Sequence, residues 1–247
     1  MRSRIADTRR RVLCALARRD VRIPYDRPLI SFSFDDFPRT ALTVGGTILQ
    51  NAGVRGTYYA APGLINTSND LGPQFCEADL LDLLSAGHEL ATHTYSHSSA
   101  RATGFTKYVH EVEQGYLALA ETMGLNTSRQ FAYPYGEITL RLKKTIGPKM
   151  HSCRGIWPGL NGPQVDLNLL HANRLYGDTE QFVPAKALIE ANSRKKSWLI
   201  FYTHDVRAKP SPYGCTPALL ERVICTAVKS GARIATVGEV IALSQSI

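Results

Sequence analysis

The stretch LISFSFDDFP, residues 29–38, decides the fold and raises the first chemical question. Residues 29–34 are apolar and alternate in the pattern of a β-strand. Asp35 and Asp36 then stand side by side at the predicted strand end, where adjacent carboxylates repel each other. A divalent cation nearby would keep both ionised, so that one binds the cation while the other accepts a proton. An exposed acidic turn is the alternative interpretation.

Strands and helices alternate along the rest of the chain. Further strands are predicted at 54–60, 89–92, 130–133, 167–172, 198–203 and 233–237, and helices at 41–52, 77–86, 106–123, 137–146, 184–193 and 217–229. Such alternation indicates parallel strands joined by helices, and seven or eight units indicate a barrel. We expect an α/β fold, a single-domain distorted (β/α)7-type barrel, with the active site at the C-terminal ends of the strands.

The N-terminal arm carries most of the net charge. The chain has 247 residues and a net charge of +8, and residues 1–20 contribute +5 through seven arginines and two aspartates. Residues 1–27 are predicted to be a basic, helical arm, for which a solvated charged helix is the simplest interpretation. Weak contact of residues 1–20 with an anionic membrane surface stays open. Nucleic acid is not an expected partner, because the rest of the chain carries only +3.

Three observations bear on the cellular compartment. The longest apolar run of the arm, residues 12–17, is shorter than the usual apolar segment of about 7–15 residues in a signal peptide. No run approaches the roughly 18 apolar residues of a transmembrane helix. Five scattered cysteines without a CxxC pair indicate free thiols. We expect a cytoplasmic protein, either free or at the inner membrane surface.

The segment GHELATHTYSH, residues 87–97, holds three histidines. His93 and His97 are four residues apart, so a helical turn would place both imidazoles on one side as a metal clip. Two histidines and one aspartate form a recurring open metal site, and residues 35–36 offer the carboxylate. His88 precedes the predicted strand and is expected to be structural.

Two further segments place polar groups after predicted strands. In FAYPYG, residues 131–136, a rigid Pro-Tyr-Gly turn can aim the backbone N–H of Tyr135 into a site, as an oxyanion hole requires. In LIFYTHDV, residues 199–206, His204 directly follows a buried strand and is placed to act as a general acid.

Taken together and in this order, the segments resemble the motifs of the polysaccharide deacetylase family (NodB homology, carbohydrate esterase family 4). The matching stretches are SFDD (33–36), HTYSH (93–97), AYPYG (132–136) and, more loosely, YTH (202–204). The resemblance extends over roughly residues 28–240 and implies a catalytic domain at 28–247.

The resemblance implies a role for each matching residue. Asp35 would be the general base, and Zn²⁺ or another divalent ion would be bound by Asp36, His93 and His97. The Tyr135 backbone N–H would stabilise the oxyanion, and His204 would protonate the departing amine. Pro134, in the same turn as Tyr135, is expected to contact the substrate.

Three positions depart from the family pattern. Phe37 replaces a glycine and is expected to narrow the rim of the site. Ala132 replaces an arginine that orients the base aspartate, and Arg154 or Arg174 could substitute for it. We predict that Arg154 does so. Trp157 is a candidate for an acetyl pocket or a sugar subsite, with core packing as the alternative.

The function implied is that of a metal-dependent hydrolase. It would remove N-acetyl groups from an acetamido sugar, in a glycan or a lipid-linked precursor, and release acetate. An O-acetyl esterase and a small-amide hydrolase are alternatives that use the same site. A catalytically weak glycan-binding homologue is the alternative from another class, and the oligomeric state is not predicted.

Overall fold

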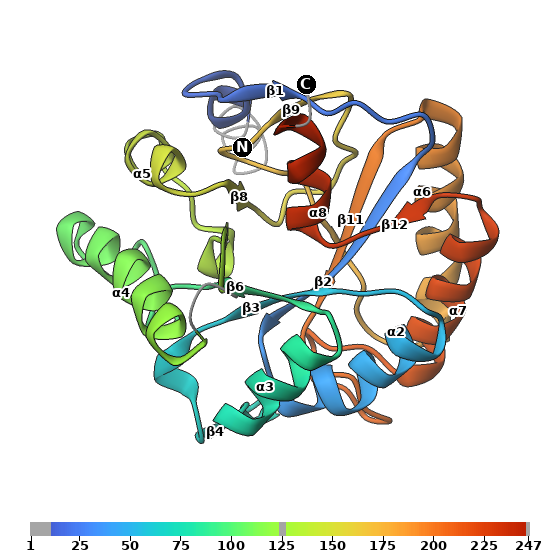
Figure 1. Cartoon of the computed structure of the whole chain (residues 1–247), viewed down its shortest axis with the longest axis horizontal. Coiled ribbons are helices and arrows are strands. Elements are labelled where there is room, and N and C mark those ends of the chain that lie inside the picture. Colours follow the sequence, from blue (N-terminus) through green and yellow to red (C-terminus); the bar gives the residue numbers. More distant parts are fainter. Residues whose placement is uncertain (1–10, 124–126, 246–247) are drawn as a thin grey trace, which may run out of the picture.

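The computed structural model describes residues 11–123 and 127–245. Within these residues, seven strands form one curved parallel sheet in the order β10-β11-β2-β3-β6-β7-β8, and β12 pairs with β2 (Figure 1). The strands are β2 (Leu29–Asp36), β3 (Thr57–Ala60), β6 (Glu89–Thr92), β7 (Thr127–Ala132), β8 (Ser152–Arg154), β10 (Asn173–Arg174), β11 (Trp198–Thr203) and β12 (Arg233–Ile234). The predicted single-domain α/β barrel is confirmed.

The central strand β2 is apolar because it is buried on both of its faces. All eight of its residues are buried, and it pairs with β11 on one side and β3 on the other. A parallel strand covered on both faces has no solvent-facing side. Its two serines donate to backbone carbonyls, Ser31 to Ala235 at 2.7 Å and Ser33 to Phe201 at 2.9 Å. Asp35 and Asp36 are therefore the polar groups that this strand presents at its C-terminal end.

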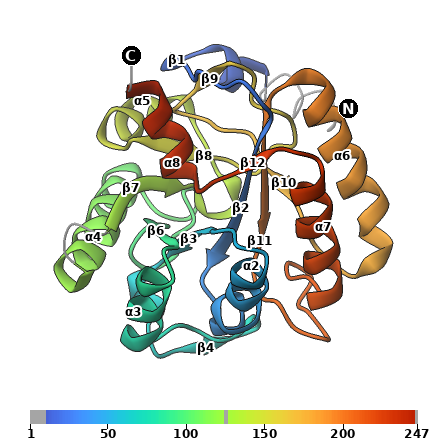
Figure 2. The same cartoon turned by 45° about the vertical axis from the view of Figure 1, so that its right-hand side comes forward.

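Helices cover the outer face of the sheet, as Figure 2 shows from a second side. They are α2 (Thr47–Asn51), α3 (Glu77–Ser85), α4 (Phe105–Met123), α5 (Leu140–Ile146), α6 (Phe182–Lys195), α7 (Pro217–Lys229) and α8 (Val237–Ala242). In α7 the side chain of Thr216 accepts a hydrogen bond from the backbone N–H of Leu219, which caps the helix start. Its buried residues recur at helical spacing, so one apolar face packs on the barrel.

The predicted helix over residues 41–52 divides into two parts. Ala41–Gly46 is π-helical, and α2 continues from Thr47. A Cβ atom added at Gly45 would lie 3.0 Å from the Phe34 ring, so glycine permits the close approach of this segment to β2.

The strand predicted at residues 167–172 is wrong. These residues lie between β9 (Gln164–Asp166) and β10, in an irregular segment. Its leucines are buried at positions 167, 169 and 170. Leu170 makes an isolated parallel bridge to Arg154, but the run forms no strand, and an apolar run does not by itself distinguish a strand from other buried chain.

One end of the barrel is closed by chain from both termini. β1 (Asp20–Arg22) pairs antiparallel with β9, and both views place these strands near α8. The core cluster there includes Leu29 and Trp198, the first residues of β2 and β11. The strands therefore begin at this closed end, and their C-terminal ends point to the other.

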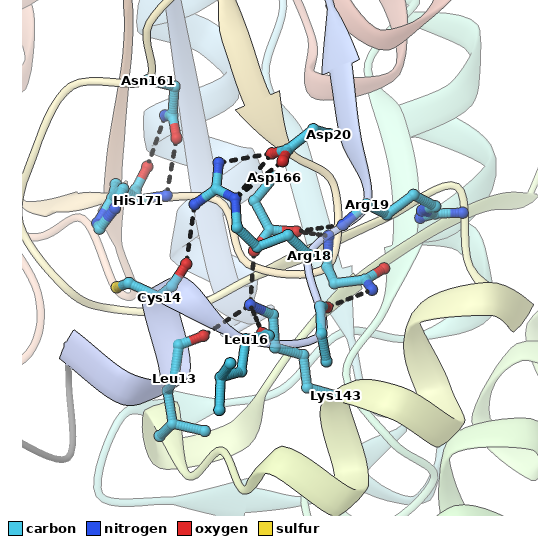
Figure 3. Close-up of polar contacts among 12 residues, drawn as sticks. Leu13, Cys14, Leu16, Arg18, Arg19, Asp20, Lys143, Asn161, Asp166 and His171 are labelled. Atoms are coloured by element: carbon cyan, nitrogen blue, oxygen red, sulfur yellow. Dashed lines mark hydrogen bonds and ion pairs between the residues drawn. The ribbon is translucent and has the colours of Figure 1, made fainter.

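Lys143 on α5 holds the N-terminal segment against the barrel (Figure 3). Its Nζ donates to the carbonyls of Leu13 at 2.7 Å and Leu16 at 2.8 Å, and lies 2.6 Å from Asp166 Oδ2. Residues 11–15 are helical, but Asp20–Arg22 forms a strand rather than continuing the predicted helix. Residues 1–10, and with them half of the proposed membrane contact, lie outside the described residues. The division of the chain at residue 27 stays a prediction.

Candidate active site

The three predicted metal ligands meet at the C-terminal ends of β2 and β6. Asp36 is the last residue of β2, and His93 directly follows β6. Nε2 of His97 lies 3.0 Å from Asp36 Oδ1, and Nε2 of His93 lies 3.4 Å from the same atom. One ligand atom from each residue lies within 4.8 Å of the others. Neighbouring parallel strands thus bring separate sequence segments to one point.

The hydrogen bonding of His93 tests whether a cation fits. Its Nδ1 lies 2.7 Å from the carbonyl oxygen of Ala132 and donates to it, because a carbonyl can only accept. Burial lowers the pKa of His93, so the ring is neutral and its Nε2 presents a lone pair. Facing it is Asp36 Oδ1, which has no hydrogen-bond partner among the described residues. Two acceptors that face each other fit a divalent metal such as Zn²⁺ between them.

The turn that carries His97 is irregular, so the predicted helical turn is wrong. Thr94 and His97 have left-handed backbone angles, φ 63° and φ 53°. Asp36 and Phe37, on the facing strand end, are also left-handed, with φ 63° and φ 64°. Each such residue costs roughly 1–2 kcal/mol and persists where its surroundings hold it. The strained backbone is concentrated around the ligand cluster.

Helix α4 holds this turn in place. The Glu111 carboxylate accepts from the backbone N–H of Ser96 at 2.9 Å and from its hydroxyl at 2.8 Å. The Glu111 carbonyl accepts from the N–H of Tyr95 at 2.9 Å. A Cβ atom added at Gly115 would lie 2.5 Å from the carbonyl carbon of Thr94. No sequence pattern marks Glu111, and the one signal for Gly115 is a glycine inside a helical pattern.

Arg154 contacts Asp35, as the sequence predicted. Its Nη2 donates to Asp35 Oδ1, and both side chains are buried. The guanidinium carbon lies 4.8 Å from the ring centroid of Tyr59 and 5.1 Å from that of Tyr202. Ala132 on β7 and Arg154 on β8 are register partners. The motif pattern places an arginine at position 132 on β7. In this chain the guanidinium comes instead from Arg154 on the neighbouring strand β8.

His204 follows β11 and is held by the loop after it. Its Nδ1 lies 3.1 Å from the carbonyl oxygen of Tyr213 and donates to it, which leaves Nε2 free for a ligand. Asp205 is buried and does not pair with His204. It accepts from the N–H of Ser211 at 2.9 Å and lies 2.7 Å from Arg207 Nε. The Asp205 carboxylate therefore fixes the loop that orients His204.

Asp35, Asp36, His93, His97 and His204 border a cavity of about 400 Å³, a size typical of ligand pockets. Tyr135 is left-handed at φ 57°, and its ring centroid lies 4.6 Å from that of His97. The cavity is lined by Asp35, Asp36, Asn69, Asp70, Leu71, His93, His97, Tyr133, Tyr135, Ile156, Tyr176, Tyr202, His204 and Tyr213. A larger hollow of about 520 Å³ between α2 and α7 contains none of the predicted site residues.

Two expectations about the rim, those for Phe37 and Pro134, are wrong, and Trp157 follows the alternative of core packing. Phe37 does not narrow the rim, since its ring is buried against Phe75 and Tyr58, with centroids at 4.9 Å and 5.1 Å. Pro134 is buried and does not line the cavity. Trp157 packs against an apolar core cluster, while its neighbour Ile156 lines the cavity. Neighbouring residues in these irregular segments face different sides, which sequence spacing alone does not resolve here.

His88 is structural, as predicted. Its Nδ1 accepts from the backbone N–H of Gly56 at 3.0 Å, and its ring lies edge-on to Tyr58 at 5.3 Å. Burial lowers the pKa of His88 to about 4, so the ring is neutral at pH 7.

The family follows from a comparison of the sequence with known families. Residues 22–147 match the polysaccharide deacetylase family model. The chain belongs to the polysaccharide deacetylase family. The matched residues include Asp35, Asp36, His93, His97 and Tyr135, whereas Arg154 and His204 lie beyond them. The resemblance to carbohydrate esterase family 4 is thereby confirmed.

Solved structures of this family share the fold. The chitin deacetylase of Colletotrichum lindemuthianum is 18% identical with a TM-score of 0.59, over 89% of this chain and 89% of that one. A peptidoglycan deacetylase of Bacillus subtilis is 15% identical with a TM-score of 0.56, over 89% and 93%. A family 4 carbohydrate esterase of Streptomyces lividans is 18% identical with a TM-score of 0.54, over 85% and 91%.

No curated protein matches the chain. Among the helices of residues 11–123 and 127–245, none combines the length and apolar character needed to cross a membrane.

Proposed function

We propose that this polysaccharide deacetylase is a metal-dependent hydrolase that removes N-acetyl groups from an acetamido sugar of a glycan and releases acetate. One observation carries the proposal. Asp36, His93 and His97 converge on one point, and the preceding residue of β2, Asp35, is held separately by Arg154. A ligand cluster beside an independently held carboxylate is what water-dependent acyl hydrolysis requires.

Asp36, His93 and His97 would hold Zn²⁺ or another divalent ion. When bound, the ion supplies Lewis acidity, which polarises the acetyl carbonyl and lowers the pKa of water. Glu111 and Gly115 keep the His97 turn in the required place through the contacts described above.

Asp35 takes the proton from the attacking water as the new carbon–oxygen bond forms. Arg154 holds this carboxylate in position, because its guanidinium is buried against it and fixed between Tyr59 and Tyr202. The Tyr135 backbone N–H stabilises the negative charge on the carbonyl oxygen. His204 then donates a proton from Nε2 to the sugar nitrogen as the carbon–nitrogen bond breaks.

The cavity supports a sugar ligand. Tyr135 and Tyr213 expose large parts of their rings at its border, and sugar rings pack well on exposed aromatic faces. The solved neighbours named for chitin and peptidoglycan suggest the glycans to try first. A lipid-linked sugar precursor in the cytoplasm, approached through the basic residues 1–20, is a second setting for the same reaction.

The test is acetate release from chitin oligosaccharides and from peptidoglycan, with the purified protein loaded with Zn²⁺. We expect acetate in molar equivalence with new amino groups, loss of release with a chelator, and recovery when Zn²⁺ is added back. O-acetylated xylan tests the ester alternative. Stoichiometric zinc with no acetate from any of these glycans would instead support the glycan-binding alternative.

A further inference from the structure

Exposed positive charge gathers at the closed end of the barrel. The parallel strands begin at this end, so the residues just before them lie there. Residues 194–196, Arg-Lys-Lys, lie just before β11, and Arg233 is the first residue of β12. All four side chains are exposed, and none forms a hydrogen bond or ion pair with another described residue.

The N-terminal segment adds cations to the same end. The side chains of Arg11 and Arg22 are exposed and also have no hydrogen-bond or ion-pair partner among the described residues. Figure 1 and Figure 2 both show β1, which contains Arg22, near one end of α6 at the closed end of the barrel. Residues 1–10, which precede Arg11, contain four further arginines and one aspartate.

Contacts join the N-terminal segment to the end of α6. Cys14 and Arg18 line a small hollow together with residues 160–162. Asn161 pairs with Trp198, the first residue of β11, through backbone hydrogen bonds of 2.9 Å and 2.7 Å. The cations of the two segments therefore belong to one surface.

This surface also includes two exposed apolar side chains. Val12 and Leu16 are 44% and 47% exposed, and the N–H of Leu16 donates to the carbonyl of Val12 at 3.0 Å. This helical hydrogen bond places the two residues one turn apart on the same face. Leu13 is buried in the core and anchors the turn from the other side. The outer face of the turn thus offers apolar groups beside the cations.

Helix stability explains only part of the charge. Cations in the last turn of a helix interact favourably with the helix dipole, which accounts for Arg194 and Lys195 on α6. Arg22 and Arg233 lie on strands, where this reason does not apply. Exposed and unpaired cations on different elements of one surface are better explained by an anionic partner.

The apolar side chains indicate which anionic partner fits. Lipid headgroups and nucleic acids both present phosphate groups that attract cations. Val12 and Leu16 favour lipid, because a bilayer also offers an apolar phase in which they lose contact with water. A nucleic acid backbone offers these two side chains no such phase.

We propose that the closed end of the barrel docks on a membrane that contains anionic lipids, through the six cations and the two apolar side chains named above. The inference does not rest on the proposed function. Docking in this way leaves the candidate active site open to solvent, because the site lies at the opposite end of the strands.

The probes are vesicles of phosphatidylcholine alone and of phosphatidylcholine with phosphatidylglycerol, and co-sedimentation measures binding of the full chain. We expect at least about tenfold tighter binding to the anionic vesicles, and weaker binding as salt is added. Lys195→Gln/Lys196→Gln should weaken this binding at least about tenfold, because each cation near the surface adds to the attraction. The control Lys107→Gln/Lys209→Gln removes the same charge from exposed lysines at the opposite end and should change binding by less than about twofold.

Leu16→Gln tests the apolar part of the surface. It should weaken binding to the anionic vesicles several-fold, whereas Leu117→Gln, at an exposed leucine of α4, should not. Urea unfolding checks that both variants are folded. On vesicle binding, hydrogen exchange should slow in residues 11–22 and stay unchanged in residues 93–97 at the candidate active site.

Equal binding to the two kinds of vesicle overturns the inference. So do equal weakening by the two lysine pairs and an unchanged affinity in Leu16→Gln. Tighter binding to a DNA duplex than to the anionic vesicles would instead assign the surface to nucleic acid. None of these measurements needs acetate release, so a failure of the proposed function and a failure of this inference are told apart.

Discussion

Two buried ion pairs at opposite ends of the barrel have different roles, one in stability and one in the candidate active site. Lys143–Asp166 joins the N-terminal segment to the domain, and Arg154–Asp35 lies at the candidate active site. At the closed end, the Lys143 ammonium contacts two carbonyls and one carboxylate, one partner for each of its N–H groups. At the other end, Asp35 borders a cavity, and the adjacent Asp36 has an oxygen without a hydrogen bond.

The difference lies in what surrounds each pair. Each N–H group of the Lys143 ammonium has an oxygen of the protein as its partner, and the pair joins two segments of the chain, so it contributes to the fold. The Arg154–Asp35 pair lies beside a cavity and next to Asp36, so a cation, water and substrate can bind there. We therefore expect substitutions at the Lys143 pair to affect stability and substitutions at the Arg154 pair to affect activity.

The largest effect is expected for Asp35→Asn. Loss of the proton acceptor should lower kcat/KM for acetate release by about 10³-fold or more. The amide still accepts from Arg154, but it leaves the buried guanidinium without its counter-charge, so the urea midpoint should also fall, and activity is compared where the variant is folded. The matched control Asp26→Asn alters an exposed side chain and should keep full activity. A variant at position 35 with near wild-type activity would rule out the proposed base.

Lys143→Met should give the reverse result. Removing one partner of a buried pair leaves Asp166 as an uncompensated charge, which costs about 3–5 kcal/mol of unfolding free energy. Urea unfolding measures this loss, and kcat/KM at a temperature where the variant is folded should stay within about twofold of wild type. The exposed neighbour provides the control, since Lys144→Met should leave stability unchanged. Equal losses of unfolding free energy in Lys143→Met and Lys144→Met would contradict the structural role of the Lys143–Asp166 pair.

Arg154→Met sharpens the comparison at the other pair. Loss of the guanidinium should misplace Asp35 and lower kcat/KM by about 100-fold, while zinc content stays at one per chain. The loss of unfolding free energy should be smaller than for Lys143→Met, because water in the cavity can solvate Asp35. Arg154→Lys should restore part of the activity, since it keeps the charge but not the planar fork. A larger loss of stability than of activity would place Arg154 with the structural pair.

The smallest effect is expected for His88, a buried histidine that takes no part in the proposed reaction. It affects how the unfolding free energy depends on pH. Its pKa of about 4 in the fold lies below the usual value of 6.5, so protons bind the unfolded chain more readily. Its stabilising contribution is complete above pH 6.5 and falls as the pH drops toward 4, by about 2 kcal/mol at pH 5. Urea unfolding of His88→Gln should show a shallower loss between pH 6.5 and 4.5, whereas exposed His110→Gln should follow the wild type.

The sequence alone predicted the structure correctly where a pattern is compatible with only one arrangement. Alternating strand and helix segments predicted the parallel barrel, and shared strand ends predicted that Asp35, Asp36, His93 and His204 converge. Arg154 could be predicted because the motif needed a charge that Ala132 lacks. The N-terminal segment was harder, because residues 20–22 become a strand only through pairing with residues 164–166.

The failures share a physical cause. The His93–His97 spacing suggested a helical turn, but contacts with α4 impose a different, strained turn. Trp157 and Pro134 lie next to cavity-lining residues, Trp157 in irregular chain and Pro134 in a 3₁₀ turn whose next residue, Tyr135, is left-handed. Tertiary contacts decided these positions, and no local pattern encodes them.

The central claim is that adjacent aspartates divide the work, with Asp36 on the metal and Asp35 on water. Zinc binding to the wild type, Asp35→Asn and Asp36→Asn, measured by calorimetry on metal-free protein, tests it most directly. We predict one zinc per chain with similar affinity for the wild type and Asp35→Asn, and at least about tenfold weaker binding for Asp36→Asn. Unchanged affinity in Asp36→Asn, or loss of zinc in Asp35→Asn, would contradict the claim.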